Sequence, residues 1–304
     1  MINSIKKFDP SFKINFIDVG SQGGFQEEWE VTKSIVKTNG FEPVLEKYKL
    51  LKYKFPEDKW FNIALWSSKG QIDFYETPTD DYSSALKPKV STFSDFGREA
   101  SIKDFKIKKI NTDTIANLIE ECDFIKLDVQ GGELEVLKGA ENTLKNVTGL
   151  CLEVAFIEVY ENQAFFGDID KFLRERGFKF ISFYGAMLAR TKEARKERGR
   201  IARLVGSNAA YIKESDKLKN NILSIIIEAT YGLPDLAMKR LKNIPEPLSK
   251  DLHKGLKKMI KNTSVYKIPG RFRFAKFLWK LISYFDERSY YFSNKLWKNS
   301  LPKN

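Results

Sequence analysis

A glycine-rich turn is the first feature of the chain that points to ligand binding. The segment Asp18-Val-Gly-Ser-Gln-Gly-Gly24 ends a predicted buried strand at 15–20 and precedes a predicted helix. Glycines allow a tight turn and close approach of a ligand to the backbone, and a helix N-terminus favours an anionic group. The turn departs from the G-x-G-x-x-G pattern of dinucleotide sites, so taken alone it indicates only a strand–glycine–helix connection.

A carboxylate lies at the end of the next predicted strand. Glu42 follows Gly20 by about twenty residues, and Pro43 after it suits the first turn of a helix. At this place in an α/β sheet, a carboxylate accepts hydrogen bonds from both hydroxyls of a ribose. The spacing favours this function over the alternative of a surface glutamate.

The third candidate segment places charged side chains inside an apolar strand. Lys126 and Asp128 alternate with apolar residues over 123–129, which predicts a central strand. Buried charges are costly unless they are satisfied, so we expect Asp128 at the carboxyl end of the strand, facing a cleft. Glu133 opens the next helix, where the dipole favours a carboxylate. The alternatives are a turn role for Asp128 and a capping role for Glu133.

Alternating strands and helices position these residues. Strands are predicted at 15–20, up to Phe41, and at 60–66, 71–76, 107–111, 123–129, 149–155, 178–184 and 209–213. Helices are predicted at 25–38, 44–54, 114–121, from about Glu133, at 168–176, and in the tail at 218–229, 236–242 and 252–261. Asn39-Gly40 is expected to end the first helix, Thr112-Asp113 to cap the helix at 114–121, and 77–104 to form a loop. The alternation predicts a mostly parallel sheet with ligands at its carboxyl edge.

These motifs together resemble a known family. Ile125–Ala140 closely resembles the signature of the FkbM family of methyltransferases, typically I-K-I-D-V-E-G-x-E-x-x-V-L-x-G-A. Further motifs similar to those of the family follow its order, with the resemblance covering about residues 14–213: Phe16–Gly20, Phe41–Pro43, Asn62–Leu65 and Asn111–Asp113. The resemblance implies a Rossmann-like class I methyltransferase fold, with a mostly parallel seven-stranded sheet, helices on both faces and a C-terminal α-helical extension.

The resemblance also implies S-adenosyl-L-methionine as the cofactor that donates the methyl group. Gly20, Ser21 and Gly23 would line its methionine part, Glu42 its ribose, and Asp128 would lie near the methyl group. The remaining cofactor-binding positions by this resemblance are Asp18, Asn62 and Ala64. The chain departs from the family where Ser21-Gln22 replaces the usual Ala-Asn and where Gln130 replaces a usual Glu. The second departure removes an acid or base beside the cleft.

Methyl transfer mainly requires that donor and acceptor be positioned. A hydroxyl acceptor must also lose a proton, for which Asp128 is the candidate base and Glu153 the reserve. On the acceptor side we expect Gln130, Glu133 and Tyr160, with Glu161 beside them; the roles of Glu153, Tyr160 and Glu161 are equally open to a structural explanation.

Other catalytic groups are limited by composition. The only histidine is His253, in the tail, so residues 1–214 contain neither a histidine base nor a Ser-His-Asp triad, and no metal site is predicted.

The nature of the acceptor follows from the resemblance alone. It suggests O-methylation of a hydroxyl on a sugar, a glycan or another small molecule. The basic run Arg190–Arg200 is suited to contact phosphate on a nucleotide-sugar or lipid-linked acceptor. Such a run is more often a solvated helix with ion pairs between successive turns.

The charge of the chain is divided unevenly. Residues 215–304 hold 19 basic and 7 acidic residues and thus the whole net charge of +12, whereas 1–214 are neutral. We therefore expect an FkbM-like methyltransferase domain at 1–214 and a basic helical extension at 215–304. Within the extension, 271–282 is basic, aromatic and amphipathic. It is expected to pack against the core or form a homodimer, ahead of peripheral membrane contact, with nucleic-acid binding last.

Two functions of other classes compete with this interpretation. The basic tail suggests an RNA methyltransferase, but the neutral core and the absence of an N/D-P-P-Y/F motif after Leu127 count against it. A non-catalytic relative could retain the fold and bind a partner or a membrane through the tail. Asp18, Gly20, Glu42 and Asp128 are all present, which argues against such decay.

The sequence also predicts a location. No run reaches the roughly 18 apolar residues of a membrane span, and the first residues lack a long apolar signal. Cys122 and Cys151 lack metal-ligand spacing and suit small buried side chains in a reducing compartment. We expect a cytoplasmic protein, with peripheral contact at the inner membrane surface as the alternative.

Overall fold

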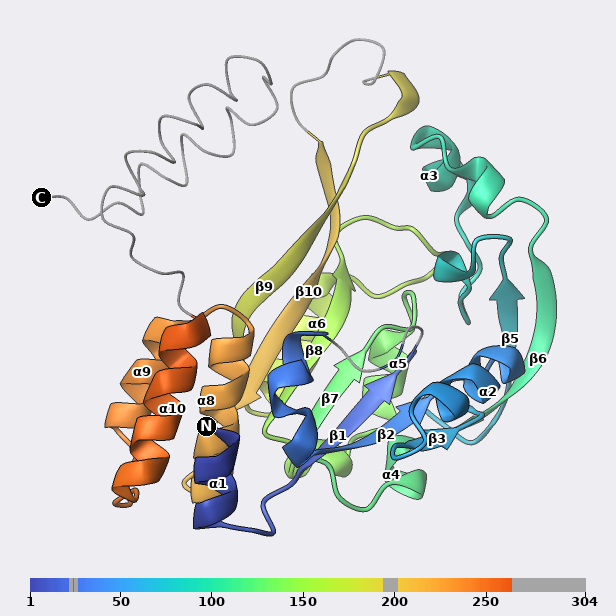
Figure 1. Ribbon diagram of the computed structural model, residues 1–304. Helices are drawn as coiled ribbons and strands as arrows, with labels where there is room; N and C mark the ends of the chain where they lie inside the picture. The colour runs from blue at the N-terminus through green and yellow to red at the C-terminus, as the bar shows by residue number, and fades with distance from the viewer. Residues whose placement is uncertain (22–23, 25–26, 194–201, 264–304) are drawn as a thin grey trace, which may run out of the picture.

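The computed structural model describes residues 1–21, 24, 27–193 and 202–263 of the 304-residue chain. Its centre is a seven-stranded sheet in the order β3-β2-β1-β7-β8-β10-β9 (Figure 1). The strands are β1 (Ile14–Val19), β2 (Val36–Phe41), β3 (Lys59–Phe61), β7 (Phe124–Leu127), β8 (Gly149–Ala155), β9 (Phe178–Ala189) and β10 (Arg203–Lys213). Neighbouring strands are parallel except that β10 runs antiparallel to β8 and β9. The predicted mostly parallel seven-stranded sheet is confirmed.

The order of the strands reverses between β1 and β7. The chain runs outward from β1 through β2 to β3, and it later returns to form β7 on the other side of β1. Val19 pairs with Leu127 at the carboxyl ends of these two strands. The turns that follow them therefore leave the sheet side by side, at the place where α/β sheets bind ligands.

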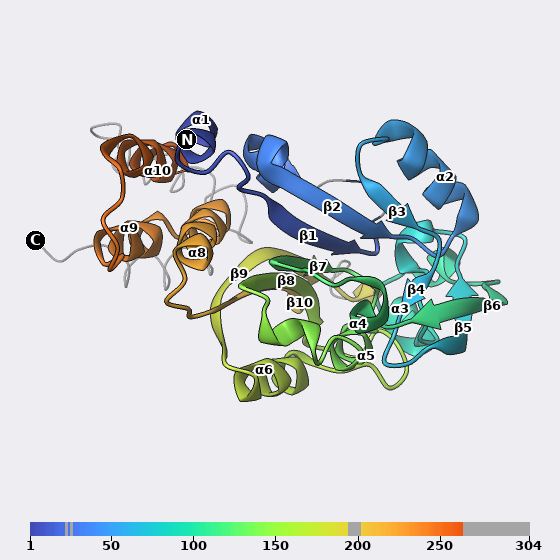
Figure 2. The ribbon, with the colours of Figure 1, turned by 90° about the horizontal axis from the view of Figure 1, so that it is seen from below.

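Two hydrophobic clusters cover the two faces of the sheet. Phe16 belongs to one cluster and Ile17 to the other, because successive side chains of a strand point to opposite faces. The face of Ile17 is covered by α5 (Glu133–Lys138) and α6 (Phe166–Glu175). The face of Phe16 is covered by η1 (Glu27–Ile35) and α8 (Leu218–Thr230). Figure 2 shows α5 and α6 on one side of the strands, so helices lie on both faces as predicted.

The segment between β1 and β2 differs from its prediction. The expected helix at 25–38 is replaced by the 3₁₀ helix η1, and Asn39-Gly40 lies inside β2 instead of ending a helix. The reason is a contact made across the sheet: a Cβ on Gly40 would lie 2.1 Å from the ring of Trp60 in β3. Gly40 therefore makes room for an aromatic ring rather than supplying a helix cap.

The predicted strand 60–66 is also wrong, because the chain turns at Asn62. Its first part is β3, whereas its last part is β4 (Ala64–Leu65) in a second sheet of order β4-β6-β5. That sheet contains β5 (Gly70–Glu76) and β6 (Lys106–Asp113), which pair antiparallel. Figure 1 shows it on the side of the molecule that carries α2 (Leu45–Lys54), a helix found where it was predicted.

The segment 77–104, which we call the excursion, joins β5 to β6 and is more ordered than the predicted loop. It contains η2 (Asp80–Tyr82), α3 (Val90–Asp95) and η3 (Glu99–Ser101). After β6, the helix α4 (Ile115–Leu118) is shorter than expected. Its cap is Thr114 rather than Thr112-Asp113, since the Thr114 hydroxyl accepts a hydrogen bond from the amide of Asn117 at 3.1 Å.

Strands β9 and β10 form a long hairpin that exceeds both predictions. β9 continues to Ala189, beyond the expected end at 184, and β10 begins at Arg203 rather than at 209. The outer parts of both strands pair with each other, which supplies their backbone hydrogen bonds away from the sheet. Most of the basic run Arg190–Arg200 lies outside the described residues.

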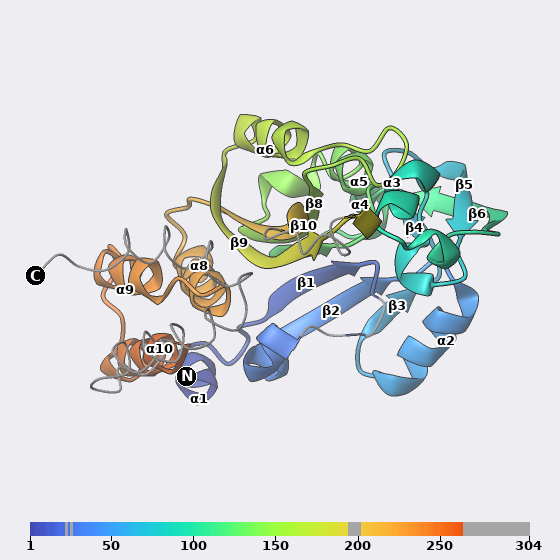
Figure 3. The ribbon, with the colours of Figure 1, turned by 90° about the horizontal axis from the view of Figure 1, so that it is seen from above.

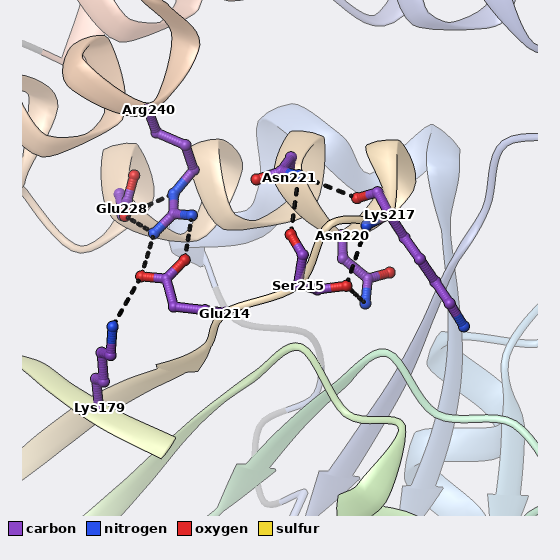
Figure 4. A network of polar contacts seen from close by, with 8 residues as sticks. All are labelled: Lys179, Glu214, Ser215, Lys217, Asn220, Asn221, Glu228 and Arg240. Atoms are coloured by element: carbon purple, nitrogen blue, oxygen red, sulfur yellow. Dashed lines mark hydrogen bonds and ion pairs between the residues drawn. The ribbon is translucent and has the colours of Figure 1, made fainter. Parts of the chain in front are cut away.

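The described part of the extension packs onto the rest of the protein. Its helices are α8, α9 (Pro234–Lys242) and α10 (Lys250–Thr263), and α10 contacts α1 (Ile2–Phe8). The Arg240 guanidinium lies 2.8 Å from carboxylate oxygens of both Glu228 in α8 and Glu214 after β10, and Lys179 lies 3.5 Å from Glu214 (Figure 4). These ion pairs join α8 and α9 to the end of β10. Glu228 is fully buried, so this part of the network is shielded from solvent.

The amphipathic stretch 271–282 lies outside the described residues, so its role in packing, dimerisation or membrane contact stays a prediction. None of the helices in the described part is long and apolar enough to cross a bilayer.

Candidate functional site

Two cavities adjoin each other at the carboxyl edge of the sheet, and Asp81 and Gln130 line both. The first cavity, of about 230 Å³, lies at the ends of β1, β2, β4 and β7. The second cavity, of about 390 Å³, lies between the end of β8, the β9–β10 hairpin and the excursion. Figure 3 views the molecule from this side, with α3 beside the strand ends.

Gly20 lets the backbone pass close to Asp128 in the first cavity. Its φ is +73°, and a Cβ at this position would lie 1.8 Å from the carbonyl oxygen of Asp128. Conformation and space therefore both exclude a side chain here. The amides of Gly20 and Ser21 point to the carbonyl of Phe41, at 3.2 and 3.5 Å, which joins this turn to the end of β2.

A buried ion cluster connects the ends of β1 and β7. The Nζ of Lys126 lies 3.3 Å from Asp18 and 3.7 Å from Asp128, and it donates to the carbonyl of Gly20 at 3.0 Å. Burial raises the pKa of Asp18, against the opposing effect of Lys126. Burial alone lowers the pKa of Lys126, but the two carboxylates outweigh it and the pKa is raised. The cluster holds Asp128 at the first cavity, whereas Asp18 lies behind the turn.

The carboxyl group of Glu42 lies in the wall of the first cavity. It is 4% exposed, and its Oε1 accepts a hydrogen bond from the amide of Val44 at 2.9 Å. Burial raises its pKa. Asn62 supports this wall from behind, because its amide donates to the carbonyls of Glu42 and Pro43 at 3.0 and 2.9 Å. Ala64 lines the cavity directly.

Gln130 joins the two cavities through its side chain. Its Nε2 donates to Asp128 at 2.9 Å and to Glu153 at 3.1 Å, and its Oε1 accepts from the hydroxyl of Tyr160 at 3.0 Å. Its φ is +56°, and its carbonyl accepts from Ser84 of the excursion at 2.7 Å. An amide can donate to two carboxylates at once, which a glutamate at this position could not do. Gln130, at which the chain departs from the family signature, thus links Asp128, the predicted base, to Glu153, its predicted reserve.

Glu133 and Glu153 are acidic side chains held in unfavourable surroundings for a charge. Burial raises the pKa of Glu133 to about 7, although its Oε1 accepts from the amides of Val129 and Gly131 at 3.0 and 3.3 Å. Burial and the charge of Asp128 raise the pKa of Glu153 well above its ordinary value. Both carboxyl groups line the second cavity. Glu133 therefore closes the turn before α5 and also faces the cavity.

Tyr160 completes this wall of the second cavity. Its side chain is 3% exposed, and burial raises its pKa well above the usual value. Its ring lies against the excursion, at 6.3 Å from the ring of Phe93. The neighbouring Glu161 instead forms an ion pair with Lys87 at 3.0 Å and lies outside the cavity lining.

The predicted residues divide into three groups. Those that line a cavity are Gly20, Glu42, Ala64, Asp128, Gln130, Glu133, Glu153 and Tyr160. Those that stand behind the first cavity are Asp18, Ser21 and Asn62; the Ser21 hydroxyl donates to the carbonyl of Asp18 at 2.8 Å. Gly23 lies outside the described residues.

The excursion supplies lining residues that sequence reasoning missed. Asp80, Asp81 and Ser83 reach the first cavity, while Phe93 and Phe96 reach the second. Lys47 of α2 lies 3.5 Å from Asp80 and joins the excursion to the first cavity. The available signal was the length of the segment, because long connections in a compact domain are usually functional.

Other reactive groups in the described part of the chain are few. No cluster of three or more His, Cys, Asp or Glu side chains there is arranged to hold a metal ion. Cys122 and Cys151 are buried as expected, and burial raises the pKa of Cys151 to about 12. Neither thiol lines either of these two cavities.

The residues of the first cavity fit an adenosine-containing donor. The missing Cβ at Gly20 leaves backbone exposed to a ligand, and the buried carboxyl group of Glu42 suits ribose hydroxyls. Apolar side chains such as Ile63, Leu65 and Phe74 provide walls for a flat base. A small apolar pocket with a few placed polar groups is the usual form of a cofactor site.

Comparison with known proteins identifies the family to which the chain belongs. Residues 18–180, more than half of the chain, match the family model described as the methyltransferase FkbM domain. A search of curated proteins gives no match.

Several solved structures are distantly similar. One is a magnesium protoporphyrin IX methyltransferase from Synechocystis, with 10% identity, a TM-score of 0.37 and coverage of 69% of this chain and 74% of that chain. A putative RNA methyltransferase from Pyrococcus horikoshii has 9% identity, a TM-score of 0.36 and coverage of 69% and 80%. A putative S-adenosylmethionine-dependent methyltransferase from Listeria monocytogenes has 10% identity, a TM-score of 0.37 and coverage of 70% and 97%.

Proposed function

Since this chain belongs to the FkbM family of methyltransferases, we propose that it methylates a hydroxyl group of a sugar, a glycan or another small acceptor. The chain is an S-adenosylmethionine-dependent methyltransferase, and the predicted cofactor, S-adenosyl-L-methionine, is confirmed. When bound, S-adenosylmethionine supplies an electrophilic methyl group, and transfer to a hydroxyl yields a methyl ether, S-adenosylhomocysteine and one proton. The residues of the chain must therefore bind the donor, orient the hydroxyl and accept the proton.

The position of Asp128 is the observation that carries the proposal. Its carboxyl group lines the first cavity, and Gln130 links it by hydrogen bonds to Glu153 in the second cavity. A base for a hydroxyl acceptor is needed where donor and acceptor meet. Lys126 forms an ion pair with Asp128 at 3.7 Å. We therefore assign to Asp128 the role of accepting the proton of the hydroxyl.

Glu153 has a different role in this arrangement. Its raised pKa favours the protonated form, which makes it a hydrogen-bond donor rather than a base. We therefore assign the base to Asp128, and we assign to Glu153, with Gln130, Glu133 and Tyr160, the orientation of the acceptor.

The donor-binding roles follow the geometry of the first cavity. Gly20 offers exposed backbone, Glu42 a carboxylate for the ribose, and Ala64 an apolar wall. Asp18, Ser21 and Asn62 hold this wall from behind, and Gly23 is assigned a place beside the methionine part of the donor on the family resemblance.

The proposal is tested by transfer of a radiolabelled methyl group from S-adenosylmethionine to methyl glycosides, nucleotide sugars and bulk RNA. We expect the label in a hydroxyl acceptor, as a methyl ether that survives alkaline hydrolysis. Asp128→Asn should lower kcat by about a hundredfold or more, because a positioned base contributes that much. The matched control is Asp73→Asn, at an exposed ion pair with Lys109 on the second sheet.

Two outcomes would replace the proposal. Label in RNA alone would favour the RNA methyltransferase. No transfer and no binding of S-adenosylhomocysteine by the folded protein would favour a non-catalytic partner-binding or membrane-binding protein.

A further inference from the structure

We propose that the second cavity selects acceptors that carry no negative charge near the reactive hydroxyl and that join this hydroxyl to an aromatic or aliphatic body. This inference rests on the proposed function, because it names the class of molecule that the same site takes. Its evidence is the lining of the second cavity, most of which comes from the excursion and the hairpin.

The polar groups of the second cavity gather at its junction with the first. Gln130 lines both cavities and holds Glu153 at 3.1 Å, and Glu133 and Tyr160 line the same wall. These side chains offer oxygen and amide groups that match a hydroxyl, which both donates and accepts hydrogen bonds. The reactive end of the acceptor therefore belongs here, next to Asp128.

The lining of the second cavity disfavours anions. Among the described lining residues, Arg98 is the one cation, and it is exposed and donates to the hydroxyl of Tyr82 at 2.8 Å. By contrast, Asp81 lines the cavity with an acidic side chain, and Glu133 and Glu153 lie inside it, where burial raises the pKa of each and so disfavours a negative charge. An anion buried beside these groups would lose its hydration and would meet no cation other than the exposed Arg98. A neutral hydroxyl compound avoids that cost.

The larger apolar side chains of the remaining wall come mainly from two distant segments. Phe93 and Phe96 of the excursion are 3% and 7% exposed, whereas Met187 and Leu188 of the hairpin are 36% and 46% exposed. Figure 1 shows α3 and the outer part of the hairpin rising beyond the edge of the sheet. Apolar side chains exposed along a cavity gain stability when a ligand covers them. The body of the acceptor is therefore expected to lie between these two segments.

Three glycosides test this inference by calorimetric titration, with and without saturating S-adenosylhomocysteine. The probes are 4-nitrophenyl β-D-glucopyranoside, 4-nitrophenyl β-D-glucuronide, which adds a carboxylate, and methyl β-D-glucopyranoside, which lacks the aromatic body. We expect the nitrophenyl glucoside to bind at least about tenfold more tightly than either of the others, a difference of about 1.4 kcal/mol. Equal or tighter binding of the glucuronide, or no detectable binding of the nitrophenyl glucoside, would overturn the inference.

Two matched variants separate the charge of the cavity from the charge of the protein. Leu188→Lys brings a cation to the wall and should raise the affinity for the glucuronide by about fivefold. Leu50→Lys adds the same charge on the exposed surface of α2, where Leu50 is 50% exposed, and should change that affinity less than about twofold. An unchanged glucuronide affinity in Leu188→Lys would contradict the charge argument.

These binding measurements fail independently of the proposed function. Loss of methyl transfer with intact selectivity among the glycosides would count against the proposed reaction alone. Methyl transfer to a charged acceptor with no preference among the probes would count against the inference alone.

Discussion

The two cavities at the edge of the sheet are built in different ways. The first is formed largely by strand ends and the turns directly after them, including Gly20, Glu42 and Asp128. The second is assembled from the end of β8, the excursion and the hairpin, which are far apart in the chain. The first cavity thus depends on local backbone geometry, whereas the second depends on how distant segments pack.

The contrast extends to the chemistry of the walls. At the first cavity the decisive feature is a missing side chain, since a Cβ on Gly20 would lie 1.8 Å from a carbonyl oxygen. At the second cavity the decisive features are side chains, with Gln130 connecting Asp128, Glu153 and Tyr160. We expect that substitutions of Gly20 and Glu42 in the first cavity change donor binding. Substitutions in the second cavity, and of Asp128 where the two cavities meet, should change the acceptor step.

The largest effect is expected for Gly20→Ala. The new methyl group would collide with the carbonyl of Asp128 in a backbone conformation that alanine rarely adopts. S-adenosylhomocysteine binding, measured by calorimetry, should fall by about a thousandfold, or about 4 kcal/mol. Gly167→Ala is the control, because a Cβ there meets nothing within 4 Å. Retained binding in a folded Gly20→Ala variant would show that the turn tolerates a side chain.

Glu133→Gln tests the acidic wall of the second cavity through stability. Because burial raises the pKa of Glu133 to about 7, its protonated form is favoured in the fold, and that stabilisation is lost as the pH rises through 7. The variant should therefore gain about 3 kcal/mol over the wild type in free energy of unfolding between pH 4 and pH 8. Urea denaturation at both pH values measures it. Glu135→Gln, in the same helix, should show no such gain, since the pKa of Glu135 is lowered.

Glu42→Ala tests the carboxylate in the first cavity. Loss of a ribose-binding group should weaken S-adenosylhomocysteine binding by about 2 kcal/mol, or roughly thirtyfold. The control is Glu46→Ala, which removes an exposed carboxylate from the first turn of α2. Equal affinities of wild type and Glu42→Ala would remove Glu42 from the donor site.

The smallest effect is expected for Gln130→Glu, which restores the residue usual in the family signature. The third carboxyl group replaces the amide that donates to both Asp128 and Glu153, so the base loses a hydrogen bond that orients it. With saturating S-adenosylmethionine, kcat should fall by about fivefold, as expected for the loss of one hydrogen bond. An unchanged kcat would contradict the proposed bridging role of Gln130.

Local patterns predicted most of the sheet and the first cavity. The apolar strands around Asp18 and Lys126, and the turns after them, are encoded by neighbouring residues, so β1, β7 and their motif residues were found. Asn39-Gly40 was misjudged because a glycine that ends a helix and a glycine that packs under Trp60 have the same local sequence. Asn62 was misjudged because its hydrogen bonds to Glu42 and Pro43, which turn the chain, are contacts between segments.

The sequence by itself determined the parallel sheet and the carboxylates at the strand ends, because burial and turn formation depend on residues close together in the chain. It also determined the neutral charge of residues 1–214, which follows from composition alone. Only the tertiary structure decided that Gln130 joins Asp128 to Glu153, and that Phe93 and Leu188 line one cavity. These contacts join segments that are far apart in the chain, and no periodic pattern in the sequence predicts them. Their placement follows from the packing of the excursion and the hairpin against the sheet, which is a property of the whole fold.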